Sequence, residues 1–252
     1  MKKLFLIGIL IVLGTFTFVS FDIKNQSKND NSDGFVLIQL FTSQGCSSCP
    51  PADRLLDKIT EDYGTKPVYT LAYHVGYWDR LGWKDPFSKK QYTAKQYDYA
   101  KKFASRSVYT PQAVINGKEH FTGSNEAKMK SAINKYLAES NNAAAISLLN
   151  ILDKGNSVDV SFSAKELPLN FKVYFALSID ERFTPVTRGE NSGKSLKNTA
   201  VVINEKELSV EEGTINLEIP DWIKPEDKLN IIAYASNKNE EVIAVTKSEI
   251  SR

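Results

Sequence analysis

The chain has two cysteines, and their position constrains the fold more than any other feature of the sequence. Cys46 and Cys49 follow the apolar run FVLIQLF at 35–41 and precede the stretch PPADRLLDKITEDY at 50–63. The first run predicts a buried strand, and the second places leucines and an isoleucine on one face of a helix. Two residues between the thiols allow a single turn to bring both sulfurs within bonding distance. The sequence therefore predicts a redox-active dithiol at a strand-to-helix junction.

Apolar periodicity along the first half predicts alternating strands and helices. Strands are expected where short apolar runs are bounded by turn residues, and helices where apolar residues recur every three or four positions. Asn116-Gly117 is a strong hairpin signal between the last two strands. Strands that alternate with helices predict an α/β fold for this half. The helix between the first two strands is expected to form a right-handed crossover between parallel strands. The expected order is strand 35–41, helix 50–63, strand 67–74, helix 88–106, strand 112–116, strand 119–122 and helix 124–139.

The pattern changes after Asn142. Apolar and polar residues alternate in several segments, as at Val158, Val160 and Phe162, and no long helical pattern interrupts them. Residues 143–252 are therefore predicted to form a separate all-β domain, a two-sheet sandwich. Its expected strands are 144–152, 157–164, 170–179, 214–219, 229–236 and 242–248.

Three blocks between residues 41 and 117 resemble a family of bacterial exported proteins catalogued as domain of unknown function 1223. The blocks are FTSQGCSSCPPAD, YHVGYWDRLGWKDPF and YTPQAVING, and the segment RGENSGKSL at 188–196 resembles the second domain of that family. The order of elements together with C-x-x-C also resembles the thioredoxin fold. The resemblance implies a thioredoxin-like domain (βαβαββα) over 35–142, followed by an all-β sandwich-like domain over 143–252. It implies a dithiol but no established substrate.

Four residues are the expected catalytic site. Cys46 is predicted to be the exposed, more acidic thiol that attacks a substrate, and Cys49 the more buried thiol that resolves the mixed disulfide. Resemblance to thioredoxin-like proteins implies that Thr110-Pro111 is a cis peptide bond facing the dithiol. The backbone of Thr110 would then pair with an extended substrate strand. Prolines at 50 and 51 predict a helix that begins at Pro50, after the dithiol.

His74 ends the second expected strand, on the sheet edge that also carries the cysteines and Pro111. One interpretation makes it a proton carrier or a metal ligand, and another makes it a histidine that is hydrogen-bonded to the adjacent loop. In the metal-binding alternative, Cys46, Cys49 and His74 hold Cu(I), a soft ion. The loop at 76–87 is rich in aromatic residues and is expected to pack on the domain rather than to form a substrate platform.

The first residues have the pattern of an export signal. Lys2 and Lys3 precede 18 uncharged residues at 4–21, which is typical of a secretory signal. The sequence leaves open whether 1–21 is a cleaved signal peptide or an N-terminal membrane anchor, because 18 apolar residues are near the minimum for a spanning helix. Residues 22–34 are polar and predict a linker. The protein is therefore expected outside the cytoplasm, as a periplasmic, secreted or membrane-anchored protein.

Charge gives no reason to expect a nucleic-acid partner. Lysine and arginine total 32 against 30 aspartates and glutamates, a net charge of +2, and without Lys2 and Lys3 the two counts are equal. The leading hypothesis is an extracytoplasmic thiol–disulfide oxidoreductase that acts on protein thiols or disulfides and needs no cofactor. The alternatives are a copper-binding carrier and a non-catalytic binding protein in which Cys46–Cys49 is a structural disulfide.

Overall fold

The computed structural model describes residues 34–139 and 144–251, and more of these residues lie in strands than in helices. Helices occur only in the first half of the described chain, and the second half contributes seven strands. In chain order the elements are β1 (Val36–Thr42), α1 (Pro50–Asp62), β2 (Val68–His74), η1 (Gly76–Leu81), α2 (Lys90–Lys102), β3 (Gln112–Ile115), β4 (Glu119–Thr122), α3 (Glu126–Leu137), β5 (Ala145–Asp153), β6 (Ser157–Lys165), β7 (Lys172–Pro185), β8 (Ser195–Leu208), β9 (Glu212–Glu218), β10 (Leu229–Ser236) and β11 (Val242–Glu249).

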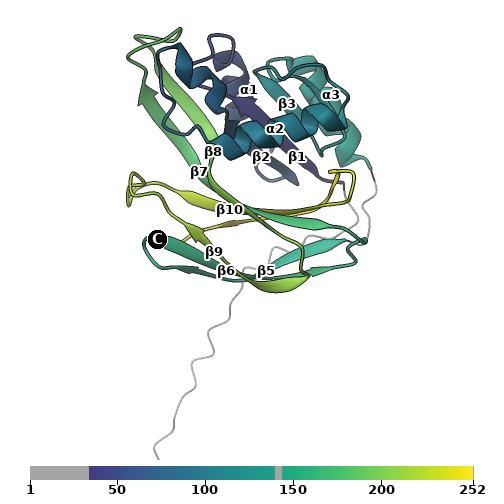
Figure 1. The fold of residues 1–252 in the computed structure, drawn as a ribbon. Coiled ribbons are helices and arrows are strands. Elements are labelled where there is room, and N and C mark those ends of the chain that lie inside the picture. The colour runs from purple at the N-terminus through teal and green to yellow at the C-terminus, as the bar shows by residue number, and fades with distance from the viewer. Residues whose placement is uncertain (1–33, 140–143, 252) are drawn as a thin grey trace, which may run out of the picture. The chain divides into compact units, whose positions relative to one another are not determined.

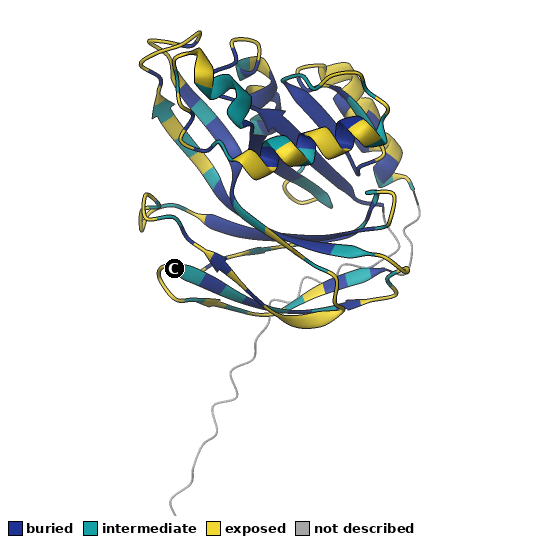
Figure 2. Ribbon diagram, in the orientation of Figure 1, coloured by how far each residue is buried: buried dark blue, intermediate teal, exposed yellow. Residues whose placement is uncertain are grey.

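Strand β1 is buried along its whole length because helices cover both of its faces. Successive side chains of a strand point to opposite faces. Val36, Ile38 and Leu40 therefore pack against the apolar faces of α1 and α3, whereas Leu37 and Phe41 pack with the tyrosines of α2. Figure 1 shows α2 in front of this part of the sheet, and Figure 2 shows that the strands are buried while the outer faces of the helices are exposed.

The two halves of the chain share one sheet. Its eight strands have the order β11-β10-β7-β8-β2-β1-β3-β4, with parallel pairs at β1–β2 and β2–β8 and antiparallel pairs elsewhere. The prediction of a thioredoxin-like βαβαββα domain followed by a separate all-β sandwich is therefore wrong. The fold is a mixed eight-stranded sheet to which both halves contribute, together with a three-stranded sheet of order β5-β6-β9.

Strand β8 is the reason for this error, since no strand was expected between 180 and 213. Its sequence SLKNTAVVINEKEL begins with polar residues that resemble a loop, yet Asn198 and Thr199 are buried. Their side chains are paired with the first half of the chain: Gln44 donates to Asn198 at 2.9 Å, and Thr199 donates to Asp57 at 2.8 Å. These hydrogen bonds satisfy the Asn198 side-chain oxygen and the Thr199 hydroxyl, which the sequence pattern alone assigns to the surface.

The core is also continuous between the halves. Tyr174, Val202 and Tyr234 from the second half pack in the same cluster as Phe41 and Tyr73 from the first. On the other face of β7 and β10, apolar residues of β6 and β9 form a second cluster with the strands of the large sheet. Figure 1 shows β7 and β8 running from the three-stranded sheet to the helical part.

The leader at 1–21 and nearly all of the predicted linker at 22–34 lie outside the described residues. None of the helices within residues 34–139 and 144–251 has the length and apolar character of a membrane span.

Candidate functional site

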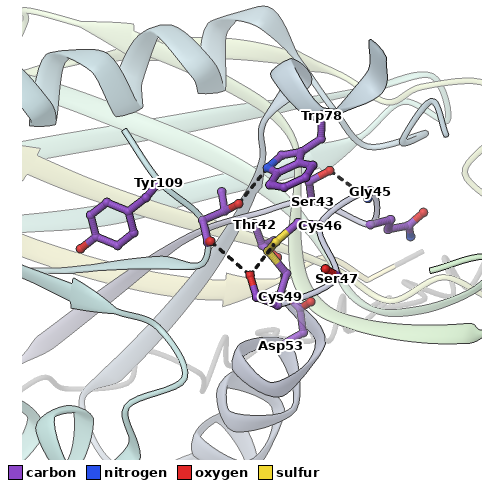
Figure 3. The surroundings of a disulfide bond; sticks show 12 residues. Thr42, Ser43, Gly45, Cys46, Ser47, Cys49, Asp53, Trp78 and Tyr109 are labelled. Atoms are coloured by element: carbon purple, nitrogen blue, oxygen red, sulfur yellow. Dashed lines mark hydrogen bonds between the residues drawn. A yellow bond between two sulfur atoms is a disulfide. The ribbon is translucent and has the colours of Figure 1, made fainter. Parts of the chain in front are cut away.

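Cys46 and Cys49 form a disulfide in the loop between β1 and α1, with their Cα atoms 5.4 Å apart. The loop turns tightly, because the Cys49 amide donates to the Cys46 carbonyl at 3.2 Å. Cys49 is the N-cap residue of α1, and its carbonyl accepts the amides of Ala52 and Asp53 at 2.8 and 3.1 Å. The predicted dithiol is therefore present as a disulfide at a strand-to-helix junction (Figure 3).

Helix α1 begins at Pro50, as the sequence predicts. Pro50 and Pro51 occupy the first helical positions and have no amide hydrogen, so the start of the helix offers fewer donors to a nearby anion than other helices do. Cys49 nevertheless keeps helical backbone angles, with φ −78° and ψ −37°. Stabilisation of a thiolate here thus depends more on side chains than on the helix terminus.

Both cysteines are fully buried, with 0% of either residue exposed. The prediction that Cys46 is the accessible sulfur is therefore wrong for this disulfide form. Ser47 and Ser48, between the cysteines, are exposed. The Ser48 hydroxyl lies 3.3 Å from the Cys46 sulfur and donates to the Thr110 carbonyl at 3.4 Å, so it covers one approach to the disulfide.

Thr110-Pro111 is a cis peptide bond, as the resemblance to thioredoxin-like proteins implies, and the Thr110 carbonyl lies next to the C-x-x-C loop. The Trp78 indole N–H donates to the Thr110 hydroxyl at 2.8 Å, and Figure 3 shows the indole next to the disulfide. Trp78 also packs closely on Gly45, where a Cβ atom would lie 3.1 Å from the Trp78 Cβ. The aromatic loop is therefore packed onto the C-x-x-C segment at this position.

The disulfide loop has a further neighbour that sequence reasoning did not single out as functional. The hairpin tip, residues 186–194 between β7 and β8, reaches the C-x-x-C segment. The buried Asn191 amide donates to the carbonyls of Gln44 and Cys46, both at 2.9 Å, and Glu190 accepts the Ser47 amide at 3.0 Å. The only sequence signal for this contact was the segment RGENSGKSL, which gives no role for any of its residues.

His74 and Asp85 form a buried pair next to the same loop. The distance between His74 Nδ1 and Asp85 Oδ2 is 2.7 Å, and neither side chain is exposed. Burial lowers the pKa of His74, but the carboxylates of Asp85, Asp53 and Asp79, chiefly that of Asp85, together outweigh this effect and raise that pKa above its usual value. The same Asp85 oxygen accepts the Gln44 amide at 2.8 Å. His74 is thus hydrogen-bonded to the adjacent loop, and Asp85 links it to the backbone before Cys46.

The three ligands of the metal-binding alternative are not assembled. The two sulfurs are bonded to each other, and His74 Nδ1 is paired with Asp85. Within residues 34–139 and 144–251, no three side chains of histidine, cysteine, aspartate or glutamate form a group that could hold a metal ion. His74 Nε2 is buried and has no hydrogen-bond partner in this part of the chain.

Asp53 lies one helical turn after Cys49 and is 5% exposed. Its carboxyl group accepts the Thr42 hydroxyl at 3.0 Å, and Figure 3 shows it next to the cysteine pair. Burial raises the pKa of Asp53 to about 7, even though the nearby His74 lowers it. A carboxyl group with this pKa exchanges its proton at neutral pH, as a proton donor or acceptor for a thiol requires.

We expect Asp53→Asn to change the pH dependence of stability. Because the pKa of Asp53 is higher in the folded chain than its ordinary value of 3.8, stability of the wild type falls as pH rises from about 4 to about 7. Asparagine at position 53 cannot ionise but still offers an acceptor to Thr42. The variant should therefore not lose stability as pH rises through this range. Urea denaturation of the oxidised proteins should show a growing advantage of the variant, on the order of 1 kcal/mol per pH unit. Parallel pH curves for the two proteins would contradict the assignment.

Comparison with known families and structures identifies a family and several similar solved structures. The family model described as "Protein of unknown function (DUF1223)" matches residues 37–235. A search of curated proteins found no match. The crystal structure of protein AGR_C_4864 from Agrobacterium tumefaciens has a TM-score of 0.61 at 24% identity, over 85% of this chain and 93% of that one. HBP35 of Porphyromonas gingivalis has a TM-score of 0.54 at 13% identity, over 87% of this chain and 76% of that one.

These structural likenesses concern the fold alone. Both neighbours match more than four fifths of this chain, so the likeness extends across the first and second halves. A match limited to one half would have covered far less of the chain. The coverage is therefore consistent with both halves contributing to one fold in each neighbour.

Proposed function

This protein belongs to DUF1223, a family of unknown function, and we propose that it is a thiol–disulfide oxidoreductase that reacts through Cys46 and Cys49. The observation that carries the proposal is the C-x-x-C disulfide at the start of α1, with Asp53 one turn behind it and Thr110-Pro111 beside it. A disulfide between cysteines three positions apart constrains very little of the chain. The presence of this disulfide is therefore better explained by a redox reaction than by stabilisation of the fold through cross-linking.

In the oxidising direction, a substrate thiolate attacks the Cys46 sulfur and the bond between the two cysteine sulfurs breaks. Cys49 leaves as a thiolate and takes up a proton. A second substrate thiolate then attacks the substrate sulfur of the mixed disulfide, and Cys46 leaves. Two electrons pass from the substrate dithiol to the protein, and the reverse sequence reduces a substrate disulfide.

Asp53 would serve the proton transfers of this cycle. Its pKa of about 7 lets both forms of the carboxyl group exist at neutral pH, and its place behind Cys49 suits exchange with that thiol. The buried His74–Asp85 pair holds the loop in front of the disulfide through the Gln44 amide. We assign the His74–Asp85 pair a supporting role, because its hydrogen bond to the C-x-x-C loop is to the backbone amide of Gln44.

The proposed substrates are thiols or disulfides of proteins outside the cytoplasm. This part of the proposal rests on the leader pattern of residues 1–21 and on the tendency of disulfides to persist in oxidising compartments. The direction of the net reaction depends on the reduction potential of the pair and on its partners.

One observation favours a second candidate, a protein in which the disulfide is purely structural. Both cysteines are completely buried, whereas exchange requires access to a sulfur. The two candidates differ in what they predict for a single free thiol at Cys46.

The Cys49→Ser variant tests the proposal by trapping. Its Cys46 thiolate should attack a synthetic peptide dimer joined by one disulfide, release one peptide as the free thiol and retain the other as a mixed disulfide. Since Cys49 is absent, the adduct should accumulate and be visible by mass spectrometry of the intact protein. The matched control is Cys46→Ser, in which we expect little adduct. Absence of the adduct in Cys49→Ser, or equal amounts in both variants, would favour the structural disulfide.

A further inference from the structure

The burial of the disulfide depends on a segment that is distant in sequence. Attack on a disulfide requires direct contact between the incoming sulfur and one sulfur of the bond. In the structure neither cysteine is exposed, although the two serines between them are. A reactive form therefore needs a rearrangement near the C-x-x-C loop, and the contacts around the loop indicate which part moves.

The hairpin tip is bound to the C-x-x-C loop by few polar contacts, and Asn191 makes the central ones. Its side-chain amide donates to the carbonyls of Gln44 and Cys46, one on each side of Gly45. Lys194 donates to the Asn191 side-chain oxygen at 2.9 Å, which fixes the orientation of the amide. Asn191 is fully buried, so no water replaces these bonds while the tip is in place.

The hairpin tip is also closed on itself. The amide of Val186 donates to the Lys194 carbonyl at 2.9 Å, and the amide of Gly193 donates to the Val186 carbonyl at 2.8 Å. Both Gly189 and Gly193 have positive φ angles, +72° and +81°, which allow the tight turn. The tip can therefore keep its internal hydrogen bonds when its contacts with the C-x-x-C loop break.

From these contacts we infer that Asn191 is a positioning residue, which holds the C-x-x-C loop beneath the hairpin tip, and that the tip moves away before a substrate sulfur reaches Cys46. The inference deepens the proposed function, because it assigns control of the same disulfide to the second half of the chain. It also accounts for a fold in which the paired ends of β7 and β8, residues 181–185 and 195–199, continue past their neighbours β10 and β2.

The test is the rate at which dithiothreitol reduces the disulfide of the folded protein. Two thiols of the reagent supply two electrons and two protons, and the reagent becomes a cyclic disulfide. Asn191→Asp keeps the size of the side chain but loses both donors. We expect its reduction to be roughly tenfold to a hundredfold faster, the factor that corresponds to two lost hydrogen bonds. Asn191→Ala, which adds no charge, should change the rate in the same direction.

Asn116→Asp is the matched control. Asn116 is also buried and donates its side-chain amide to a backbone carbonyl, that of Phe35, at the opposite end of β1 from the disulfide. It should lose thermal stability as Asn191→Asp does, yet its rate of reduction should equal that of the wild type. Unchanged rates in both Asn191 variants, or equal acceleration in the control, would overturn the inference.

The proposed function is tested separately, by turnover of a dithiol peptide. Faster reduction of the Asn191 variants without any turnover would support the positioning role and refute the oxidoreductase. Turnover by the wild type with unchanged reduction rates in the Asn191 variants would refute the positioning role alone.

Discussion

A fragment of residues 34–142 is expected not to fold, although it contains every helix of the described chain. Without the second half, β2 loses its neighbour β8, and the cluster around Phe41 and Tyr73 loses Tyr174, Val202 and Tyr234. Burial of a large apolar side chain contributes about 1.5–3 kcal/mol, so losing these three contacts removes a free energy comparable to the net stability of a domain, about 5–15 kcal/mol. Circular dichroism during urea denaturation should show no cooperative transition for the fragment.

The chain of residues 34–252 is the control for this experiment and should unfold in one cooperative step. If the fragment unfolds cooperatively at a similar urea concentration, the first half has a sufficient core of its own. The shared sheet would then be a contact between two independent domains.

Asp85→Asn is expected to destabilise the protein by about 3–5 kcal/mol near pH 6, the range for removing one partner of a buried ion pair. The Asp85 carboxylate accepts from His74, from the Gln44 amide at 2.8 Å and from the Phe87 amide at 2.9 Å. Asparagine brings a side-chain amide into this site and leaves protonated His74 without its hydrogen-bonded counter-charge. Urea denaturation of both proteins at several pH values measures the effect.

The pH dependence of this effect follows from His74. Its pKa is raised in the folded protein, so its contribution to stability is present below the ordinary value of 6.5 and is lost as pH rises through the folded value. The difference between wild type and Asp85→Asn should therefore be smaller at pH 9 than at pH 6. Asp98→Asn removes an exposed partner of Lys101 and should cost less than about 1 kcal/mol. A loss at Asp85 that is equally small would contradict the role of the buried pair.

Local patterns predicted the elements around the site well. The sequence places the first strand, the start of α1 at Pro50 and the hairpin at Asn116-Gly117 within one or two residues of their observed positions. Periodicity, proline and turn residues determine these features over short distances. The third helix is expected to begin at 124, but α3 begins at Glu126 after its cap residue Asn125, whose side-chain oxygen accepts the Lys128 amide.

Features that depend on distant contacts could not be predicted in this way. β8 resembles a loop because Asn198 and Thr199 are polar, and only their partners in the first half, Gln44 and Asp57, make their burial favourable. The burial of Cys46 likewise depends on its surroundings, among them Trp78 and the hairpin tip about 140 residues along the chain. Pairwise contacts of this kind leave no periodic signal, so the sequence alone predicted an exposed thiol and an independent second domain.

Catalytic turnover tests the proposed oxidoreductase most directly. The oxidised protein is mixed with an excess of a dithiol peptide and glutathione disulfide, which reoxidises the Cys46–Cys49 pair, and formation of the peptide disulfide is followed by chromatography. The wild type should oxidise many equivalents of peptide per molecule, faster than glutathione disulfide alone, and Cys46→Ser should add nothing to that background. A wild-type rate equal to that of Cys46→Ser would contradict the proposed function.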